Sequence, residues 1–232
     1  MTSQTTDWKT QVLEEGYGIV PEIIDMSRIL PLGSALEKEA HRRSKAGIRH
    51  LMSVPEVAEI ASGKEMISLA KAVVGAGAVP FRATLFDKSS SSNWLVAWHQ
   101  DTALPIRERR EGSEWGPLSV KEGVVYAHAP REALERVGAL RLHLDTSDPD
   151  NGPLRVLPGT QGLGVLTDEE IHKFSEEIKQ VDCPVPASGV VLMRPLVIHA
   201  SSKTTSKKPR RVLHIEYAAS EELASGVKLA VV

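Results

Sequence analysis

The sequence predicts an α+β fold, with flanking N-terminal helices followed by a double-stranded β-helix (jelly-roll, cupin-like) core. Three observations predict this fold. Apolar residues recur at helical spacing in the first third of the chain, short β-rich segments follow from Pro80 onward, and Gly, Pro, Asp and Ser separate those segments. Helices first and antiparallel strands afterwards are typical of α+β proteins.

Two N-terminal segments are expected to be helical, within a region of about residues 1–78. The segment IIDMSRILPLGSALEKEAHRR has apolar residues at mixed spacings of three and four, and GKEMISLAKAVVGAG ends in glycines that suit a helix C-terminus. A later helix is expected over IHKFSEEIK, because Thr167 and Glu170 form a Thr-x-x-Glu capping box before it.

Seven segments are expected to be strands of the core, which spans about residues 79–220. They are FRATLF, NWLVAWHQ, ALRLHLD, LRVLP, GVVLMRP, LVIHA and RVLHIEYA. No repeat or linker interrupts them, so residues 1–232 are expected to form a single domain.

The composition indicates which partners the protein has. Lys and Arg number 28 against 30 Asp and Glu, so there is no strong field for a nucleic acid or an anionic membrane, and a small-molecule substrate is favoured. Cys183 is the single cysteine, which excludes an internal disulfide and fits a reducing compartment. Without a signal-like start or a long apolar run, the protein is expected to be cytoplasmic, as a monomer or homodimer.

Paired histidine and acidic residues indicate a metal site. On a strand, residues i and i+2 point to the same side, so His-x-Asp places two ligands together. By chance a chain with 8 His and 30 acidic residues would contain about one His-x-Asp/Glu. Three occur, and the residues alone do not choose among them: His99 with Asp101, His143 with Asp145, and His214 with Glu216.

A family resemblance favours the first pair. The blocks WHQD, HLDTSDPDNGPLRVLPGTQ and HASSKTTSKKPRRVLHIEYA resemble the phytanoyl-CoA dioxygenase family in order and spacing. The resemblance implies an oxygenase that uses Fe(II), 2-oxoglutarate and O2, with His99, Asp101 and His199 as catalytic metal ligands. It places His143 in a strand before a structural turn, and the strand with His214 would line the pocket or pack.

The same resemblance implies residues that bind the cosubstrate. A guanidinium can bind the far carboxylate of 2-oxoglutarate through two hydrogen bonds, and Arg210 has the matching position, while Arg211 would face the opposite side of its strand. Ser201 resembles a serine that binds the same carboxylate. Arg141 and Arg82 are expected to reach the cofactor or the substrate, although a structural ion pair is an open alternative for Arg141.

The roughly thirty residues from Thr102 to Pro130 are expected to form a long excursion beside the metal, typical of a lid. Arg107 and Arg109 in this segment are candidate ligands for an anionic substrate, and the alternative is a solvated loop in which acidic neighbours balance them. Trp94 and Trp98 are expected to pack in the core.

The predicted function is therefore hydroxylation of a small molecule, coupled to decarboxylation of 2-oxoglutarate to succinate and CO2. The sequence leaves two alternatives open. One is a cupin-like metal dioxygenase or isomerase that uses no 2-oxoglutarate and would not need Arg210. The other is a catalytically inert jelly roll that binds a small molecule.

Overall fold

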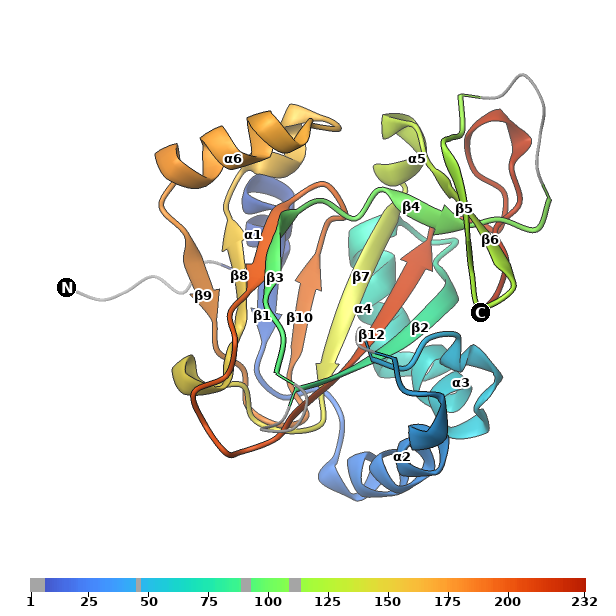
Figure 1. Cartoon of the computed structure of the whole chain (residues 1–232). Coiled ribbons are helices and arrows are strands. Elements are labelled where there is room, and N and C mark those ends of the chain that lie inside the picture. Colours follow the sequence, from blue (N-terminus) through green and yellow to red (C-terminus); the bar gives the residue numbers. More distant parts are fainter. Residues whose placement is uncertain (1–6, 45–46, 89–92, 109–113) are drawn as a thin grey trace.

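The computed structural model describes residues 7–44, 47–88, 93–108 and 114–232, and its core is a pair of facing β-sheets with helices outside them (Figure 1). The strands are β1 (Tyr17–Val20), β2 (Val79–Lys88), β3 (Val96–His99), β4 (Ala103–Pro105), β5 (Leu118–Lys121), β6 (Val124–His128), β7 (Val137–His143), β8 (Leu154–Leu157), β9 (Val181–Cys183), β10 (Val190–Met193), β11 (Ile198–Ser201) and β12 (Arg210–Ala218). Strand order is β1-β10-β7-β12-β2 in the first sheet, β3-β11-β8-β9 in the second and β4-β6-β5 in a third, smaller sheet.

The helices fall mostly before the first long strand, as the sequence predicts. They are α1 (Trp8–Glu15), α2 (Met26–Lys38), α3 (Pro55–Ser62), α4 (Lys64–Val74), α5 (Arg131–Leu134) and α6 (Asp168–Glu177). Short 3-10 helices cover Glu39–Arg42, Leu51–Ser53, Pro149–Asn151, Thr160–Leu163 and Ala224–Gly226. None of these described helices combines the length and the apolar character that crossing a membrane requires.

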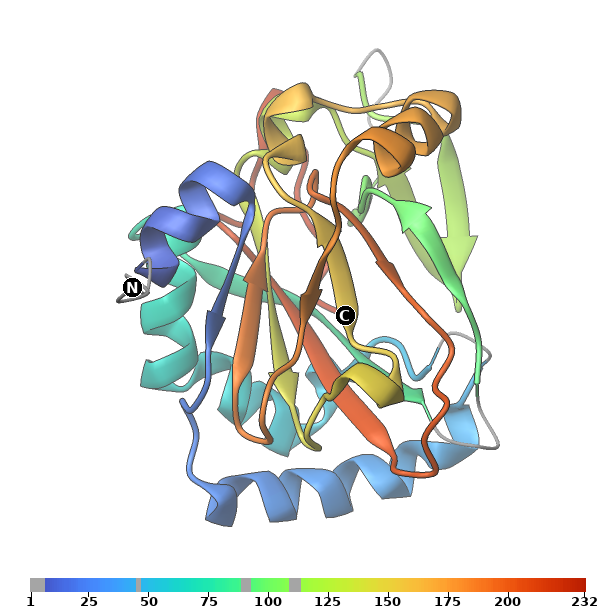
Figure 2. The ribbon, with the colours of Figure 1, turned by 90° about the vertical axis from the view of Figure 1, so that its left-hand side faces the viewer.

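Helices α1, α2, α3 and α4 share one buried cluster with the outer face of the five-stranded sheet, and Figure 2 shows them outside this sheet. Leu140 and Leu142 of β7 belong to the same buried cluster as Leu69 and Val73 of α4. Because side chains alternate along a strand, Arg141 between the two leucines points to the other face. The polar side of β7 therefore faces the space between the two sheets.

The space between the sheets contains an apolar cluster at one end. Ala139, Val191 and Met193 come from the first sheet, and Leu154 and Val156 come from the second. Within the described residues no strand pairing joins the two sheets into a closed ring. The jelly-roll core is therefore an open sandwich, with room for a site between its layers.

Most predicted elements are confirmed, and two segments differ from expectation. Tyr17–Val20, inside the region expected to be helical, forms β1 and pairs antiparallel with β10, because Gly16 turns the chain with φ 81° after α1. The described parts of the 102–130 excursion are not an irregular loop. They form the third sheet, in which β4 and β5 flank β6.

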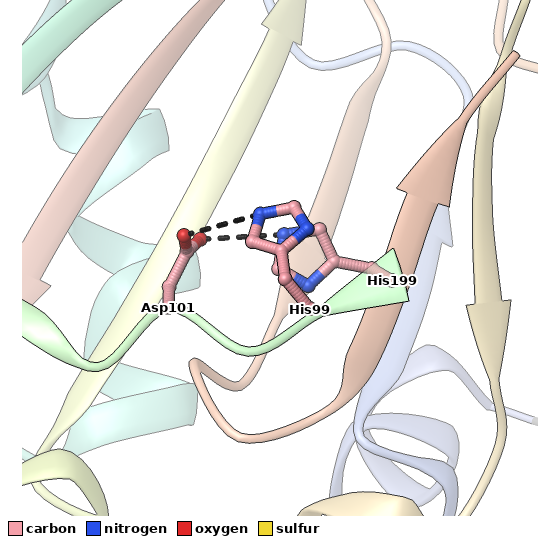
Figure 3. A group of neighbouring side chains, drawn as sticks. All are labelled: His99, Asp101 and His199. Carbon is pink, nitrogen blue, oxygen red and sulfur yellow. Dashed lines mark ion pairs between the residues drawn. The ribbon is translucent and has the colours of Figure 1, made fainter. Parts of the chain in front are cut away.

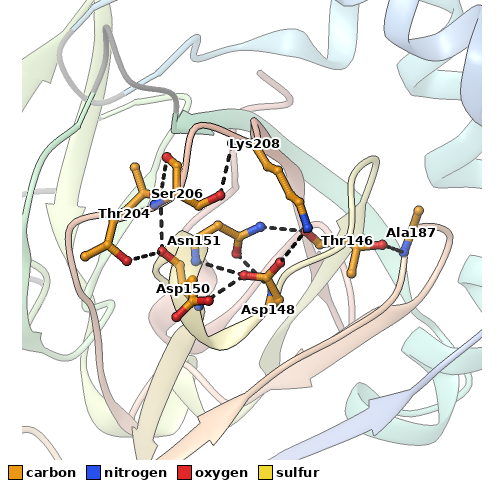
Figure 4. Close-up of polar contacts among 9 residues, drawn as sticks. Thr146, Asp148, Asp150, Asn151, Ala187, Thr204, Ser206 and Lys208 are labelled. Atoms are coloured by element: carbon orange, nitrogen blue, oxygen red, sulfur yellow. Dashed lines mark hydrogen bonds and ion pairs between the residues drawn. The ribbon is translucent and has the colours of Figure 1, made fainter.

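A network of polar contacts fixes the turn between β7 and β8 (Figure 4). Asn151 is fully buried. Its Oδ1 accepts from the Asp148 backbone N–H at 2.9 Å, and its Nδ2 donates to the Thr146 carbonyl at 2.7 Å. The next residue, Gly152, has φ 69°, and its carbonyl accepts a hydrogen bond from Ser201 Oγ at 2.9 Å. The turn is therefore connected directly to β11.

Asn151→Ala is expected to lower the free energy of unfolding by about 2 kcal/mol, because it removes a fully buried side chain and leaves the Thr146 carbonyl and the Asp148 N–H without their partner. Urea denaturation would measure the change. Asp150→Ala is the matched control, since the Asp150 side chain is exposed, and it should change stability by less than about 0.5 kcal/mol. Equal losses in both variants would contradict this account of the turn.

Candidate active site

Three potential metal ligands meet at the edge where β3 and β11 pair (Figure 3). His99 ends β3 and lies directly opposite His199 of β11 in the strand register. Trp98 and Ile198, their preceding neighbours, pack in the cluster on the α6 side, so both histidines point to the interior of the sandwich. Asp101 follows β3 and is held by a hydrogen bond from its backbone N–H to the Pro195 carbonyl at 2.9 Å.

The three side chains converge on one small volume. One ligand atom from each lies within 4.8 Å of the others, and this is the only such group of His, Cys, Asp or Glu found among the described residues. His99 Nε2 is 3.6 Å from Asp101 Oδ1, and His199 Nε2 is 3.4 Å from Asp101 Oδ2. Two imidazoles and a carboxylate on one side are the donor set of the facial triad.

The histidine rings are oriented for metal binding by their other nitrogen. Nδ1 of His99 donates to the Ala97 carbonyl and Nδ1 of His199 donates to the Val197 carbonyl, each at 2.9 Å. A carbonyl can only accept, so Nδ1 carries a proton, and in the neutral ring the lone pair is on Nε2, which faces Asp101. Burial and the nearby His99 lower the pKa of His199, which also favours the neutral, ligating form.

The carboxylate between the rings is kept ionised. Burial by itself raises the pKa of Asp101, but His199 and His99 outweigh it and hold the pKa well below its ordinary value. The intervening residue, Gln100, points the other way. Its Nε2 donates to the carbonyls of Gly164 and Leu196, which fixes the segment that carries Asp101. Sequence reasoning did not identify this support.

A cavity of about 190 Å³ lies beside the three ligands. Its lining includes cationic groups and very little acid: Lys88, Arg141 and Arg210 against the single carboxylate of Asp101. The remaining lining residues are Phe86, Trp94, Val96, His99, Leu154, His199, Ala200 and Ser201. A buried cavity with this charge balance suits an anion.

Arg210 and Ser201, predicted as partners of a cosubstrate carboxylate, lie together in this cavity. Arg210 NH2 donates to Ser201 Oγ at 3.3 Å, while its buried Nε and NH1 have no partner among the described residues. Burial, followed by the neighbouring Arg141, lowers the pKa of Arg210 to about 9. Arg210 is only 2% exposed, so its guanidinium has unused donors in a place that water reaches poorly.

Lys88 is a site residue that sequence reasoning missed. It is 1% exposed and lies directly opposite Arg210 where β2 pairs with β12. Its Nζ donates to Ser201 Oγ at 2.7 Å and to the Ser202 carbonyl at 2.5 Å, with a longer contact of 3.4 Å to the Ser201 carbonyl. Strand alternation could have found it, because Lys88 shares a face of β2 with Arg82, which the sequence had already singled out.

The two tryptophans near the first ligand strand differ in role. Trp98 packs on the α6 side as expected. The prediction for Trp94 is wrong, because its ring lines the cavity, with Lys88 Nζ 5.6 Å from the ring centroid. Trp94 precedes β3, so strand alternation does not fix its direction.

Arg141 enters the cavity, as the alternation of β7 predicts. It is 6% exposed and donates through NH1 to His214 Nδ1 at 3.0 Å, and its Nε has no partner among the described residues. Burial lowers the pKa of Arg141 to about 10 and, with Arg141 beside it, the pKa of His214 well below its ordinary value. His214 is therefore neutral, and its Nδ1 accepts a hydrogen bond from the guanidinium.

The structure does not bring Arg82 to the cavity that contains Arg210. Its guanidinium pairs with the buried Glu216 and donates to the Ala103 carbonyl at 3.0 Å. Glu216 is on the same face of β12 as His214, which lines a neighbouring pocket together with Arg82, and neither Glu216 nor His214 belongs to the metal group. Contact between Arg82 and a cosubstrate stays a prediction with no support from this placement.

The arginines predicted in the excursion are not brought to the site. Arg107 donates to the Leu229 carbonyl at 3.0 Å and to Glu221 at 3.2 Å, which ties it to the C-terminal segment. The acidic partner agrees with the alternative that these arginines are balanced by neighbouring carboxylates. Arg109 lies outside the described residues.

His143 and Asp145, the rival His-x-Asp pair, make contacts within the protein that do not involve the metal group. Asp145 accepts hydrogen bonds from Arg211 Nε and NH2, each at 2.9 Å, on the face opposite Arg210. His143 is completely buried and its Nδ1 donates to the Arg141 carbonyl at 3.0 Å, and burial lowers the pKa of His143 to about 3. These contacts separate both residues from the metal group.

Known proteins resemble this chain in sequence and in fold. L-proline trans-4-hydroxylase of Streptomyces griseoviridis is 24% identical over 178 residues, which are 66% of this chain and 59% of that protein. The chain thus spans less than two thirds of the length of this curated relative. AviO1 from Streptomyces viridochromogenes has a TM-score of 0.68 at 22% identity, covering 91% of this chain and 93% of that one. EctD from S. alaskensis, solved with 2-oxoglutarate and 5-hydroxyectoine, has a TM-score of 0.70 at 16% identity, covering 97% and 81%.

The solved structures establish the likeness of the fold. The sequence comparison goes further, because a family model described as phytanoyl-CoA dioxygenase matches residues 34–212, well over half of the 232 residues. That span includes the three ligands, Lys88 and Arg210. The chain belongs to the phytanoyl-CoA dioxygenase family.

Proposed function

We propose that the protein is a non-haem Fe(II) and 2-oxoglutarate dependent dioxygenase that hydroxylates a small molecule in the cytoplasm, with residues 1–232 acting as one domain. The single observation that carries the proposal is the cavity itself, which joins a His–Asp–His group to a buried arginine with unused donors. Related folds solved with iron and with 2-oxoglutarate support the choice of cofactors.

The donor set fits Fe(II). His99 and His199 would bind through Nε2 and Asp101 through one carboxylate oxygen, and the remaining positions would face the cavity. Iron with bound 2-oxoglutarate supplies the activation of O2 that decarboxylates 2-oxoglutarate and oxidises a C–H bond. Asp101 also fills the position that a halide would need, so hydroxylation is proposed rather than halogenation.

The far end of the cavity fits the second carboxylate of 2-oxoglutarate. Lys88 and Arg210 are cross-strand neighbours of like charge, an arrangement that costs free energy unless an anion lies between them. The free Nε and NH1 of Arg210 would donate to the carboxylate, and Lys88 would hold Ser201 and Arg210 in position. In this arrangement Ser201 Oγ already donates to Gly152, so its direct contact with the carboxylate needs that bond to exchange.

Other residues of the chain would orient the reactants and exclude water. Phe86 and Trp94 close the apolar sides of the cavity. Arg141, held by its hydrogen bond to His214, places its positive charge in the space beside the metal ligands. Gln100 keeps Asp101 in place through its two carbonyl contacts. Charged groups among the buried residues of this cavity interact more strongly than they would in water.

Anaerobic titration tests this function. Adding 2-oxoglutarate to the protein with Fe(II) is expected to produce a visible absorption band with one equivalent of each, and admitting air should then release succinate slowly. A protein that binds Fe(II) but gives neither the band nor succinate would be the cupin-like enzyme without 2-oxoglutarate. Binding of small metabolites without any iron affinity would indicate the inert jelly roll.

Lys88→Met is expected to weaken 2-oxoglutarate binding about tenfold near pH 6 and to remove its pH dependence. Without a bound anion, burial, followed by Arg210 and Arg141, lowers the pKa of Lys88 to about 7, whereas a nearby carboxylate would raise it. The wild type should therefore bind 2-oxoglutarate most tightly below pH 7. Above pH 7 binding should weaken, because the Lys88 amine is then mostly neutral in the free protein and must take up a proton when the carboxylate binds.

Calorimetry of 2-oxoglutarate binding between about pH 6 and pH 8 would check this expectation, because this range includes the titration of Lys88 and lies below that of Arg210. Lys88→Arg is the charge-conserving control and should keep the affinity without the slope, because arginine stays protonated throughout. The same slope in wild type and Lys88→Met would show that another group titrates.

A further inference from the structure

A second cavity, of about 180 Å³, lies on the other side of Asp101. It shares Asp101 and Phe86 with the first cavity, whereas Lys88, Ser201 and Arg210 line only the first. The remaining residues of its lining are Arg49, Arg82, Thr84, Lys121, Tyr126 and His214. A molecule in this second cavity would lie next to a metal ligand without occupying the cosubstrate end.

The charges around the second cavity are not balanced. Arg82 pairs with the buried Glu216, and Arg49 NH1 lies 3.3 Å from Glu122 at the more exposed rim. Lys121 has no carboxylate within 4 Å among the described residues. Its Nζ lies 4.7 Å from the centroid of the Tyr126 ring. A cation in this position has a ring face beneath it and an open side toward the cavity.

The other titratable groups facing Lys121 do not neutralise it. His214 is neutral because it accepts from Arg141, and burial lowers the pKa of His50, which contacts Tyr126 Oη at 3.0 Å. Burial, followed by Arg82 and Arg49, lowers the pKa of Lys121, and Asp101 opposes this shift. In the proposed function Asp101 would bind the metal, so it would not neutralise Lys121.

A tight hairpin fixes the position of Lys121. It is the last residue of β5 and pairs with Val124 across a two-residue turn in which Glu122 has φ 50° and Gly123 has φ 81°. Positive φ at both central residues is typical of a type I′ turn, whose twist matches the flanking strands. Tyr126 pairs with Ser119 on the same hairpin, which places its ring diagonally next to the lysine.

We propose that the second cavity binds a carboxylate or phosphate group of the substrate through Lys121 and Arg49, and so presents the substrate to the metal from the Asp101 side. This inference rests on the proposed function and names its substrate class as anionic. It also changes which cation of the 102–130 segment is expected to bind the anionic group of the substrate. Lys121 lines the second cavity, whereas Arg107 is bound to Glu221.

Charge-selective lysine labelling tests the proposal without knowledge of the substrate. The purified protein is treated with pyridoxal 5′-phosphate or with uncharged pyridoxal, reduced with borohydride and mapped by peptide mass spectrometry. The phosphate reagent is expected to favour Lys121 about tenfold relative to pyridoxal, after normalisation to the exposed Lys173. An equal preference at Lys121 and Lys173 would overturn the proposal.

Variants and competitors sharpen the result. Arg49→Met should reduce the preference for the phosphate reagent at Lys121, and Arg107→Met, the matched control, should leave it unchanged. Protection of Lys121 by inorganic phosphate but not by acetate would assign a phosphate group, and the reverse would assign a carboxylate. Protection by neither anion would overturn the proposal. Labelling needs neither iron nor 2-oxoglutarate, so its outcome is separate from that of the anaerobic titration.

Discussion

His99→Ala, Asp101→Ala and His199→Ala are each expected to weaken Fe(II) binding by more than about 100-fold and to abolish succinate formation, because each removes one of three protein ligands. Thermal unfolding should remain cooperative in all three variants, since these side chains line a cavity rather than the packed core. Calorimetric titration with Fe(II) under anaerobic conditions would measure the loss.

His143→Ala is the matched control for the metal site. It removes a buried histidine that is also part of a His-x-Asp pair, but whose ring contacts the Arg141 carbonyl instead of the other ligands. The variant should keep its Fe(II) affinity even if its stability falls. Loss of iron in His143→Ala together with retention in His99→Ala would place the metal at the other pair.

Arg210→Met is expected to raise the dissociation constant for 2-oxoglutarate about 100-fold and to leave Fe(II) binding unchanged. Two hydrogen bonds from a buried guanidinium to a carboxylate are worth about 3 kcal/mol or more together, and the variant removes both donors. Titration of the Fe(II) protein with 2-oxoglutarate, followed through its absorption band, would measure the effect.

Arg211→Met serves as the control because it is the next residue on the same strand with its side chain on the opposite face. It loses its two contacts with Asp145 and should become less stable, with unchanged 2-oxoglutarate affinity. If Arg210→Met binds 2-oxoglutarate as the wild type does, the cosubstrate end of the cavity is assigned wrongly.

Local patterns predicted the parts of the fold that have a clear period or a cap. The alternation of Leu140, Arg141 and Leu142 gave the two faces of β7, and the capping box of Thr167 and Glu170 gave the start of α6, in which Glu170 N–H donates to Thr167 Oγ1 at 3.2 Å. β1 was missed because four residues after a glycine are too few to show a strand period, and its identity depends on pairing with the distant β10.

The residues of the candidate site also fall into two groups, those that a local pattern predicts and those whose place depends on long-range pairing. Strand alternation and family resemblance indicated the three ligands and Arg210, since those residues lie at fixed spacings in the chain. Lys88 could have been found from the face of β2 that it shares with Arg82, but its position opposite Arg210 depends on the pairing of β2 with β12. Lys121 and Trp94 could not be found by spacing alone, because Lys121 is placed by the hairpin of the third sheet and Trp94 lies before β3, where strand alternation does not fix its direction. Arg82 is the opposite case. Its spacing from His99 suggested contact with the cosubstrate, but its guanidinium forms an ion pair with Glu216.

Isotopic labelling of succinate tests the central claim most directly. The anaerobic protein with Fe(II) and 2-oxoglutarate is exposed to 18O2, and the succinate is analysed by mass spectrometry. We expect one 18O atom in each succinate, released with one CO2, because oxidative decarboxylation transfers one oxygen atom of O2 to the former keto carbon. Absence of succinate, or succinate that carries no 18O, would contradict the assignment of His99, Asp101, His199 and Arg210 to an Fe(II) and 2-oxoglutarate dependent dioxygenase.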